Sequence, residues 1–278
     1  MNKISANING VDCEVAWSEI TTKLKQFVSW QELAFNFDNF MDSYQDQIDW
    51  LVKAIVEMLP PNLDRTQVKK IISVGSGIST LELLLSQYFI NAHIWLVDKS
   101  EITNPEYFLP DGKFKCPDGI YENHQVGFYN DWDITNDAIA TSNLDKNRIH
   151  FLNPLDPWPN DVDLIYSGRA WCWDFSKDAY WDKAMTSLKI GGSLIVDILR
   201  VSDRRVALEI SEELGSMPIK IVNRHKSKPW LLLSPRIDWD ELNNLDIIEK
   251  YAEILSPNQS IFSLNHTFGR KYSWIREK

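Results

Sequence analysis

Apolar residues recur along this chain in two patterns, and together these patterns predict alternating strands and helices. Short apolar runs, each followed by polar or glycine-containing sequence, predict buried strands; they lie at residues 71–74, 93–97, 148–152, 162–167 and 193–197. Apolar positions three or four residues apart predict helices between several of these runs. This alternation favours an α/β fold, with a mostly parallel sheet and helices on both faces.

The sequence before the first of these strands predicts an addition to the sheet. Residues 1–68 are expected to form an N-terminal helical extension, and its clearest helix spans residues 42–59. The apolar stripe of that helix indicates that it covers a flank of the sheet. A lid over the substrate is the alternative interpretation.

The sequence after the fifth strand predicts the end of the sheet and a further addition. The core is expected at residues 69–234, and a C-terminal helix and strand are expected at residues 235–278. Residues 229–233 and 272–275 both have the composition of strands. Either of them is expected to be the terminal antiparallel strand.

A glycine turn and an acidic residue follow the first two predicted strands. The strand at 71–74 leads directly into Gly75-Ser76-Gly77, and the strand at 93–97 ends on Asp98. Glycine allows the chain to turn sharply and lets a ligand approach the backbone. An acid about twenty residues after such a turn is typical of units in which a carboxylate binds a ribose diol. The sequence therefore predicts an adenosine site at this turn.

The spacing of the glycines distinguishes between adenosine ligands. Dinucleotide-binding turns have a third glycine at the position of Thr80, so a nicotinamide cofactor fits this sequence poorly. Residues 73–79 instead resemble the acid-x-Gly-x-Gly-x-Gly pattern of class I S-adenosyl-L-methionine-dependent methyltransferases. They depart from it twice, because Ser73 replaces the acid and Ser79 replaces the third glycine. The resemblance implies a Rossmann-like fold and S-adenosyl-L-methionine as cofactor.

Other segments extend this resemblance over roughly residues 68–200. Residues 163–165 in the fourth strand and 188–192 before the fifth occur in the order found in class I methyltransferases. A narrower group, the sugar O-methyltransferases, is similar in three short segments, at residues 126–130, 151–154 and 197–200. This similarity implies transfer of a methyl group to a hydroxyl of a sugar or another small molecule.

The cofactor residues are expected at the carboxyl ends of the strands, where open α/β sheets bind their ligands. Asp98 is expected to hydrogen-bond the ribose. Asn153 either contacts the adenine amine or forms an ordinary turn with Pro154. The full expected set is Ser73, Gly75, Ser76, Gly77, Asp98, Lys99, Asn153, Pro154 and Ser167.

Acceptor-side residues are expected in loops at the same end of the sheet. The candidate general bases, needed only if the acceptor hydroxyl must lose its proton early, are His124, Asp131 and Asp174. The candidate substrate contacts are Tyr129, Arg169, Trp171 and Trp173. A surface histidine, an ordinary ion pair and buried tryptophans are the alternative interpretations.

No metal is expected in this site. Metal-dependent catechol-type methyltransferases have an acid at the end of strand four and Asp-Asn at the end of strand five. Here Ser167 and Asp197-Ile198 occupy those positions.

Composition limits the partners. The chain has 278 residues, 44% of them hydrophobic and 24% charged, and a net charge of −10. An acidic chain lacks the basic footprint of a nucleic-acid or anionic-membrane surface. Cys13, Cys116 and Cys172 are scattered, which favours a reducing, cytoplasmic compartment.

Two other functions remain open from the sequence. An NAD(P)-dependent oxidoreductase uses the same strand-turn-helix-strand unit. A non-catalytic, methyltransferase-like binding module is compatible with the replacements at Ser73 and Ser79. The expected activity is methyl transfer to a hydroxyl of a small molecule or glycan, with an unknown oligomeric state.

Overall fold

The structure is a computed structural model of the 278-residue chain. It describes residues 2–21, 24, 40–59, 63–98, 114–116, 119–121, 132–168, 170–171, 179–198, 220–223 and 230–235.

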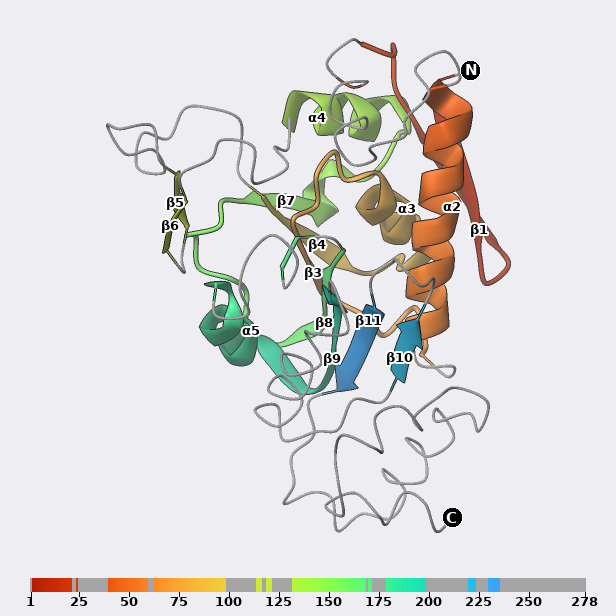
Figure 1. The fold of residues 1–278 in the computed structure, drawn as a ribbon. Helices are drawn as coiled ribbons and strands as arrows, with labels where there is room; N and C mark the ends of the chain where they lie inside the picture. The colour runs from red at the N-terminus through yellow and green to blue at the C-terminus, as the bar shows by residue number, and fades with distance from the viewer. Residues whose placement is uncertain are drawn as a thin grey trace.

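A seven-stranded sheet forms the centre of the described structure (Figure 1). Its strands, in spatial order, are β10 (Lys220–Asn223), β11 (Trp230–Pro235), β9 (Leu188–Ile198), β8 (Val162–Ser167), β3 (Lys70–Val74), β4 (His93–Val97) and β7 (Ile149–Leu152). The five strands from β9 to β7 are parallel to one another. β11 is antiparallel to both of its neighbours, β9 and β10. The antiparallel strand is therefore 230–235, whereas residues 272–275 lie outside the described part of the chain.

Helices lie on both faces of this sheet. Along β3, Ile71 belongs to one hydrophobic cluster and Ile72 to the other, as the alternation of side chains in a strand requires. The first cluster includes residues of α2 (Phe40–Met58), α3 (Thr80–Tyr88) and α4 (Trp132–Thr141). The second includes residues of α5 (Trp181–Ser187). The prediction of a Rossmann-like α/β fold is confirmed.

The N-terminal extension begins with a hairpin, so the prediction of helical structure there is wrong for residues 3–16. β1 (Lys3–Ile8) and β2 (Val11–Ala16) pair in antiparallel register. Asn9 and Gly10 connect them with φ values of 49° and 84°. Asn-Gly favours a two-residue turn with positive φ at both positions, and its twist matches that of the flanking strands. The helix expected at 42–59 is present as α2.

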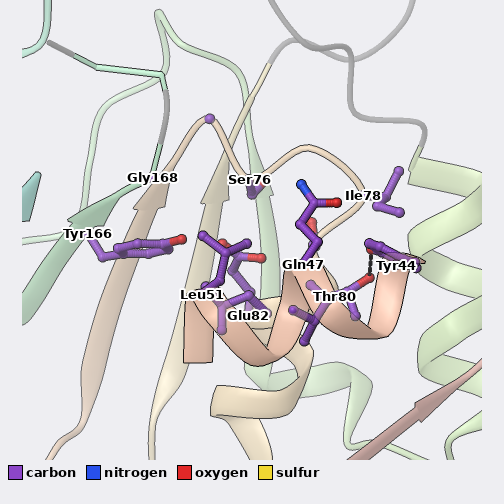
Figure 2. A pocket seen from close by; sticks show the side chains of 13 residues that line it. Tyr44, Gln47, Leu51, Ser76, Ile78, Thr80, Glu82, Tyr166 and Gly168 are labelled. Carbon is purple, nitrogen blue, oxygen red and sulfur yellow. Dashed lines mark hydrogen bonds between the residues drawn. The ribbon is translucent and has the colours of Figure 1, made fainter. Parts of the chain in front are cut away.

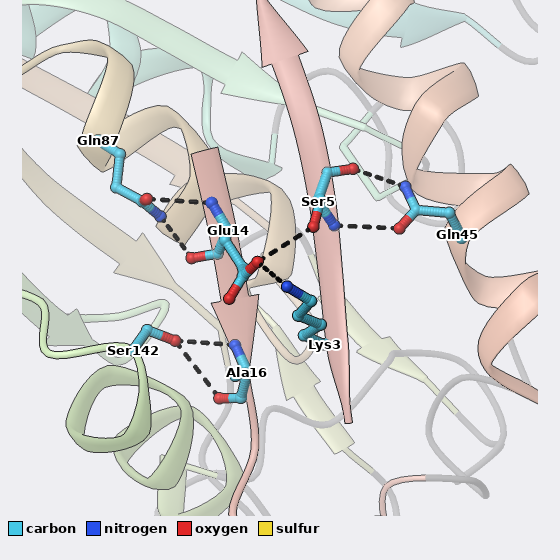
Figure 3. A network of polar contacts seen from close by, with 7 residues as sticks. All are labelled: Lys3, Ser5, Glu14, Ala16, Gln45, Gln87 and Ser142. Carbon is cyan, nitrogen blue, oxygen red and sulfur yellow. Dashed lines mark hydrogen bonds and ion pairs between the residues drawn. The ribbon is translucent and has the colours of Figure 1, made fainter. Parts of the chain in front are cut away.

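Side chains from three helical regions close the outer edges of this hairpin (Figure 3). Gln45 of α2 accepts a hydrogen bond from Ser5 N and donates one to Ser5 O, at 3.0 and 2.7 Å. Gln87 of α3 forms the same pair with Glu14, at 3.0 and 2.8 Å. Ser142, after α4, accepts from Ala16 N at 2.8 Å. These contacts satisfy backbone groups that an open strand edge would leave unpaired.

Two further segments differ from expectation. Residues 188–192 were expected to form a turn before the fifth strand, but they are the beginning of the continuous strand β9. The register with β8 shifts between Val162 and Leu164, so the extra residues are absorbed as an irregularity in the strand pair. A short hairpin of β5 (Phe114–Cys116) and β6 (Gly119–Tyr121) lies in the stretch that was expected to be irregular.

Candidate functional site

The glycine turn lies where the chain order of the strands reverses. β3 pairs with β4 on one side and with β8 on the other, so a crevice is expected at its carboxyl end. Gly75 has a φ of 73°, and its N–H donates to Val97 O at 2.7 Å. A Cβ on Gly75 would lie 2.1 Å from the Cβ of Ala170. The turn therefore requires glycine for its conformation and for its close packing against residue 170.

Asp98 is placed directly against this turn. Its Oδ2 atom accepts a hydrogen bond from Gly77 N at 2.7 Å, and only 6% of the residue is exposed. Its own N–H donates to Leu152 O at 3.2 Å, which fixes Asp98 between the ends of β4 and β7. A hydrogen bond to a carboxylate is charge-assisted and is worth about 1.5–3 kcal/mol. The acid and the glycine turn predicted from the sequence are thus brought together.

Ser79 has a backbone conformation that favours glycine, the residue that the family pattern has at this position. Its φ is 61°, in the left-handed region that glycine adopts most easily. It precedes α3, and its side chain makes no capping hydrogen bond to the helix. The glycine of the family pattern would therefore fit the observed turn without strain, and this chain has a serine there.

Ser167 joins the ends of two strands through its hydroxyl. The hydroxyl donates to Val74 O and accepts from Trp171 N, both at 2.9 Å, and the residue is fully buried. Ser167 therefore fixes the chain beside the glycine turn. This arrangement differs from the expected contact between its side chain and the cofactor.

Trp171 is also fully buried, which corrects its expected role as a substrate contact. Its ring packs edge-on against Tyr180, with centroids 6.0 Å apart, and at a tilt against Trp181. These aromatic contacts stabilise the core on the α5 side of the sheet. A ring enclosed in this way offers no face to a sugar.

Asn153 and Pro154 form a compact turn after β7. Asp156 Oδ2 accepts from Asn153 N at 2.8 Å and from Asn153 Nδ2 at 3.4 Å, and Asp156 N donates back to Asn153 O at 3.0 Å. Lys183 Nζ donates to Pro154 O at 2.6 Å. These contacts match the ordinary-turn interpretation of the Asn-Pro pair. They place Asn153 at the end of β7, next to the strand that carries Asp98.

A small cavity lies between the glycine turn, the start of α3, the end of β8 and the inner side of α2 (Figure 2). Its free volume is about 50 Å³. Tyr44, Gln47 and Leu51 form the α2 wall, while Ser76 and Glu82 belong to the opposite side. α2 thus lines a cavity beside the glycine turn as well as packing on the flank of the sheet, as the first interpretation of this helix expects. The lid over a substrate stays a prediction.

Glu82 is the residue in this cavity that sequence reasoning missed. It is 3% exposed, and its Oε1 atom accepts a hydrogen bond from Ser73 Oγ at 2.6 Å. Burial raises the pKa of its carboxyl to about 7, although the hydrogen bond from Ser73 acts in the opposite direction. The available signal was an acid within the apolar run 81–85, beside a strand that lacks its expected acid.

Thr80 occupies the position of the third dinucleotide glycine and is tied to α2. Its Oγ1 atom lies 2.5 Å from the hydroxyl oxygen of Tyr44, within a hydrogen bond in which either group can donate. Both side chains are buried. A branched side chain at this position fits a turn that contacts a helix above it, and it conflicts with the close packing that a dinucleotide turn needs.

The remaining predicted site residues lie outside the described residues. They are His124, Asp131, Asp174, Lys99, Tyr129, Arg169 and Trp173. Within the described ranges, no group of three or more His, Cys, Asp or Glu side chains could hold a metal ion. None of the described helices has the length and apolar character needed to cross a membrane.

Comparisons with known proteins give matches in structure alone. No model of a protein family matches the sequence, and no curated protein matches it. A precorrin-6y C5,15-methyltransferase from Geobacter metallireducens is 14% identical, with a TM-score of 0.44 over 68% of this chain and 89% of the other. An O-methyltransferase family protein from Burkholderia thailandensis is 14% identical, with a TM-score of 0.40 over 78% and 71%.

A third match is a fibrillarin, a pre-rRNA processing protein from Methanococcus jannaschii. It is 12% identical, with a TM-score of 0.42 over 85% of this chain and 95% of the other. The three matches describe what the chain resembles. The argument for its function rests on the site itself.

Proposed function

We propose that this protein is an enzyme that transfers a methyl group from S-adenosyl-L-methionine. The observation that carries the proposal is the contact between Asp98 and Gly77 at the point where the strand order reverses. A buried carboxylate next to backbone N–H groups of a glycine turn suits the hydroxyls of a ribose. The small cavity on the other side of the turn leaves space for a compact polar group.

The same turn argues against a dinucleotide cofactor. A pyrophosphate must approach the beginning of the helix closely, and the third glycine of the dinucleotide pattern permits that approach. Here Thr80 is at that position and is hydrogen-bonded to Tyr44. Oxidation or reduction with NAD(P) is therefore the weaker alternative.

Methyl transfer is an in-line displacement, so the protein contributes mainly by positioning two reactants. The cofactor supplies a methyl group bonded to a positively charged sulfur. In this proposal Asp98 orients the ribose, and the main chain at Gly75–Gly77 packs against the cofactor. Tyr44 and Leu51 of α2 line the cavity beside the turn.

The acceptor is proposed to be a hydroxyl of a small molecule or sugar. This finer part of the proposal rests on the similarity of segments 151–154 and 197–200 to sugar O-methyltransferases. His124, Asp131 and Asp174 are the proposed candidates for a general base. Arg169 is the proposed contact for an anionic acceptor.

Calorimetric titration with S-adenosylhomocysteine, S-adenosyl-L-methionine and NADH tests the cofactor assignment. We expect the first two to bind and NADH not to bind. Asp98→Ala should abolish binding, whereas Asp46→Asn, which removes an exposed charge on α2, should leave it unchanged. At about a hundred times its dissociation constant, a ligand should also raise the stability by about 2.7 kcal/mol. Binding of NADH alone would reverse the assignment.

Incubation with radiolabelled S-adenosyl-L-methionine then tests the acceptor. Mixtures of sugars and hydroxylated small molecules should become labelled, and Asp98→Ala should remove the labelling. Labelling of RNA in place of these molecules would overturn the proposed acceptor and leave methyl transfer intact. Cofactor binding without labelling of any acceptor class would favour the non-catalytic binding module.

A further inference from the structure

The cavity beneath α2 contains a single charged side chain among the described residues that line it. That side chain is Glu82, and the other polar groups on the wall are hydroxyls, one amide and the backbone of the turn. Burying a carboxylate is costly unless a donor or a cation balances it. Glu82 receives hydrogen bonds from the hydroxyl of Ser73, at 2.6 Å, and from its own backbone N–H, and the described residues that line the cavity include no cation. The chemistry of the cavity therefore suits a positively charged group.

Glu82 also lies next to the position at which this chain lacks the acid of the family pattern. The resemblance places an acid at position 73, on β3, but this chain has Ser73. The hydrogen bond between Ser73 and Glu82 brings a carboxylate from α3 to within one hydrogen bond of that strand position. The carboxylate that β3 lacks at Ser73 is thus supplied by Glu82 of α3.

The size of the cavity limits the group that it can hold. A single water needs roughly 10–15 Å³ of such free volume. A free volume of about 50 Å³ therefore has space for only a few atoms, comparable with an α-amino-acid head group. The adenosine portion of a cofactor is too large for this cavity. Asp98, the proposed ribose contact, lies outside it, because Asp98 contacts Gly77 and neither residue lines the cavity.

We propose that Glu82 is a positioning residue that binds the ammonium group of the methionine portion of the cofactor, in place of the acid missing at Ser73. This inference rests on the proposed function, because it assigns one end of the same ligand. Gln47 and Ser76, on opposite walls of the cavity, contribute polar groups around the amino-acid end.

The protonation of Glu82 gives the interaction a recognisable pH dependence. Burial raises the pKa of its carboxyl to about 7, so near neutral pH a substantial share of the empty protein carries Glu82 in its neutral form. The titratable groups that face it are the hydroxyls of Tyr44 from α2 and Tyr166 from β8, and burial raises the pKa of Tyr44. Ammonium binding should therefore become tighter as the pH rises from about 6 to about 8, because Glu82 ionises.

Two ligands separate this inference from the proposed function. S-adenosylhomocysteine carries the amino-acid end, whereas 5′-methylthioadenosine has the same nucleoside and lacks that end. We expect Glu82→Gln to weaken S-adenosylhomocysteine roughly 10- to 100-fold and to leave 5′-methylthioadenosine within about twofold. The amide keeps an acceptor for Ser73 and should preserve the fold. Glu14→Gln, on the surface of the hairpin, is the matched control and should change neither affinity.

Each outcome decides one of the two proposals. Equal weakening of both ligands by Glu82→Gln, or no weakening, would overturn the role of Glu82 and leave the methyltransferase proposal standing. Absence of binding of either ligand to the wild-type protein would overturn both.

If Glu82→Gln does not fold, the wild-type protein still provides the test. The affinity ratio of the two ligands should rise between about pH 6 and about pH 8 in favour of S-adenosylhomocysteine. Loss of the ligand's own proton would change the ratio in the opposite direction. A ratio that is constant or falls with pH would overturn the inference.

Discussion

An ideal Cβ on Gly75 would lie 2.1 Å from the Cβ of Ala170, closer than two non-bonded carbon atoms can approach. The turn after β3 and the segment after β8 are therefore packed so closely that one hydrogen atom is the largest side chain that fits. Both segments follow strands that meet at the proposed cofactor site. The same turn also donates a hydrogen bond from Gly77 N to Asp98 Oδ2, so it is held at two positions.

Gly75→Ala should destabilise the protein and abolish binding of S-adenosylhomocysteine. Gly191 is the matched control, because its φ of 76° is close to the 73° of Gly75, while a Cβ there would meet nothing within 4 Å. Gly191→Ala should cost only the backbone strain, about 1–2 kcal/mol, and should keep binding unchanged. Gly75→Ala should cost about 1–3 kcal/mol more, because of the clash. Urea unfolding and calorimetry measure both effects, and equal costs for the two variants would contradict the packing argument.

The buried carboxyl of Glu82 should make stability depend on pH. Its pKa in the folded protein, about 7, lies above the ordinary value of 4.5, so the folded state holds the proton more tightly than the unfolded state. Stability should therefore fall as the pH rises from about 4.5 to about 7, by on the order of 3 kcal/mol in total. Glu82→Gln should remove this component.

Thermal unfolding of the ligand-free protein and of Glu82→Gln across this pH range provides the measurement. The quantity that matters is the difference between the two proteins, because other groups titrate in both. A difference that is constant with pH would show that folding does not raise the pKa of Glu82.

The hydrogen bond between Tyr44 and Thr80 should couple α2 to α3. Tyr44→Phe and Thr80→Val each remove one hydroxyl of a buried pair whose oxygens are 2.5 Å apart, and each should cost about 1–3 kcal/mol. The double variant should lose less stability than the sum of the two single variants, because it leaves no buried hydroxyl of this pair without its partner. A double-mutant cycle measured by urea unfolding checks this, and strict additivity would mean that the two hydroxyls do not interact.

Gln87 should protect the outer edge of β2. Gln87→Ala removes the hydrogen bonds to the N–H and C=O of Glu14 and should lower stability by about 1–2 kcal/mol. Amide hydrogen exchange gives a local measurement with an internal control. The Glu14 amide should exchange faster, while the Ser5 amide, bonded to Gln45, should be unaffected. Unchanged exchange at Glu14 would mean that this edge is not held by the glutamine.

The parallel sheet was predictable because its signals are local. The run at 71–74, the glycines after it and Asp98 lie within one short unit, and the structure brings them together as the pattern requires. The later strands are also short apolar runs between polar segments. Their order in the sheet was not predicted, since periodicity alone does not determine which strands are neighbours.

The features that were missed depend on a single dipeptide or on contacts between distant residues. The hairpin was indicated by Asn9-Gly10, a two-residue signal that was overlooked within a segment interpreted as helical. Glu82 was missed because a helix that covers a sheet is expected to bury one apolar face, whereas α3 is buried around almost its whole circumference. The enclosure of Trp171 depends on α5, and no local pattern distinguishes it from an exposed tryptophan.

The glutamine and serine contacts of the hairpin have a consequence for the order of assembly during synthesis. The turn at Asn9 and Gly10 joins residues that are adjacent in the chain, so the hairpin can close as soon as it leaves the ribosome. Its partners are translated much later, because Gln87 follows Glu14 by 73 residues and Ser142 follows Ala16 by 126. The edge of β1 is covered earlier, by Gln45, which follows Ser5 by 40 residues. Until Gln87 and Ser142 are made, the nascent chain therefore presents the open edge of β2, at which premature association with other chains is most easily initiated.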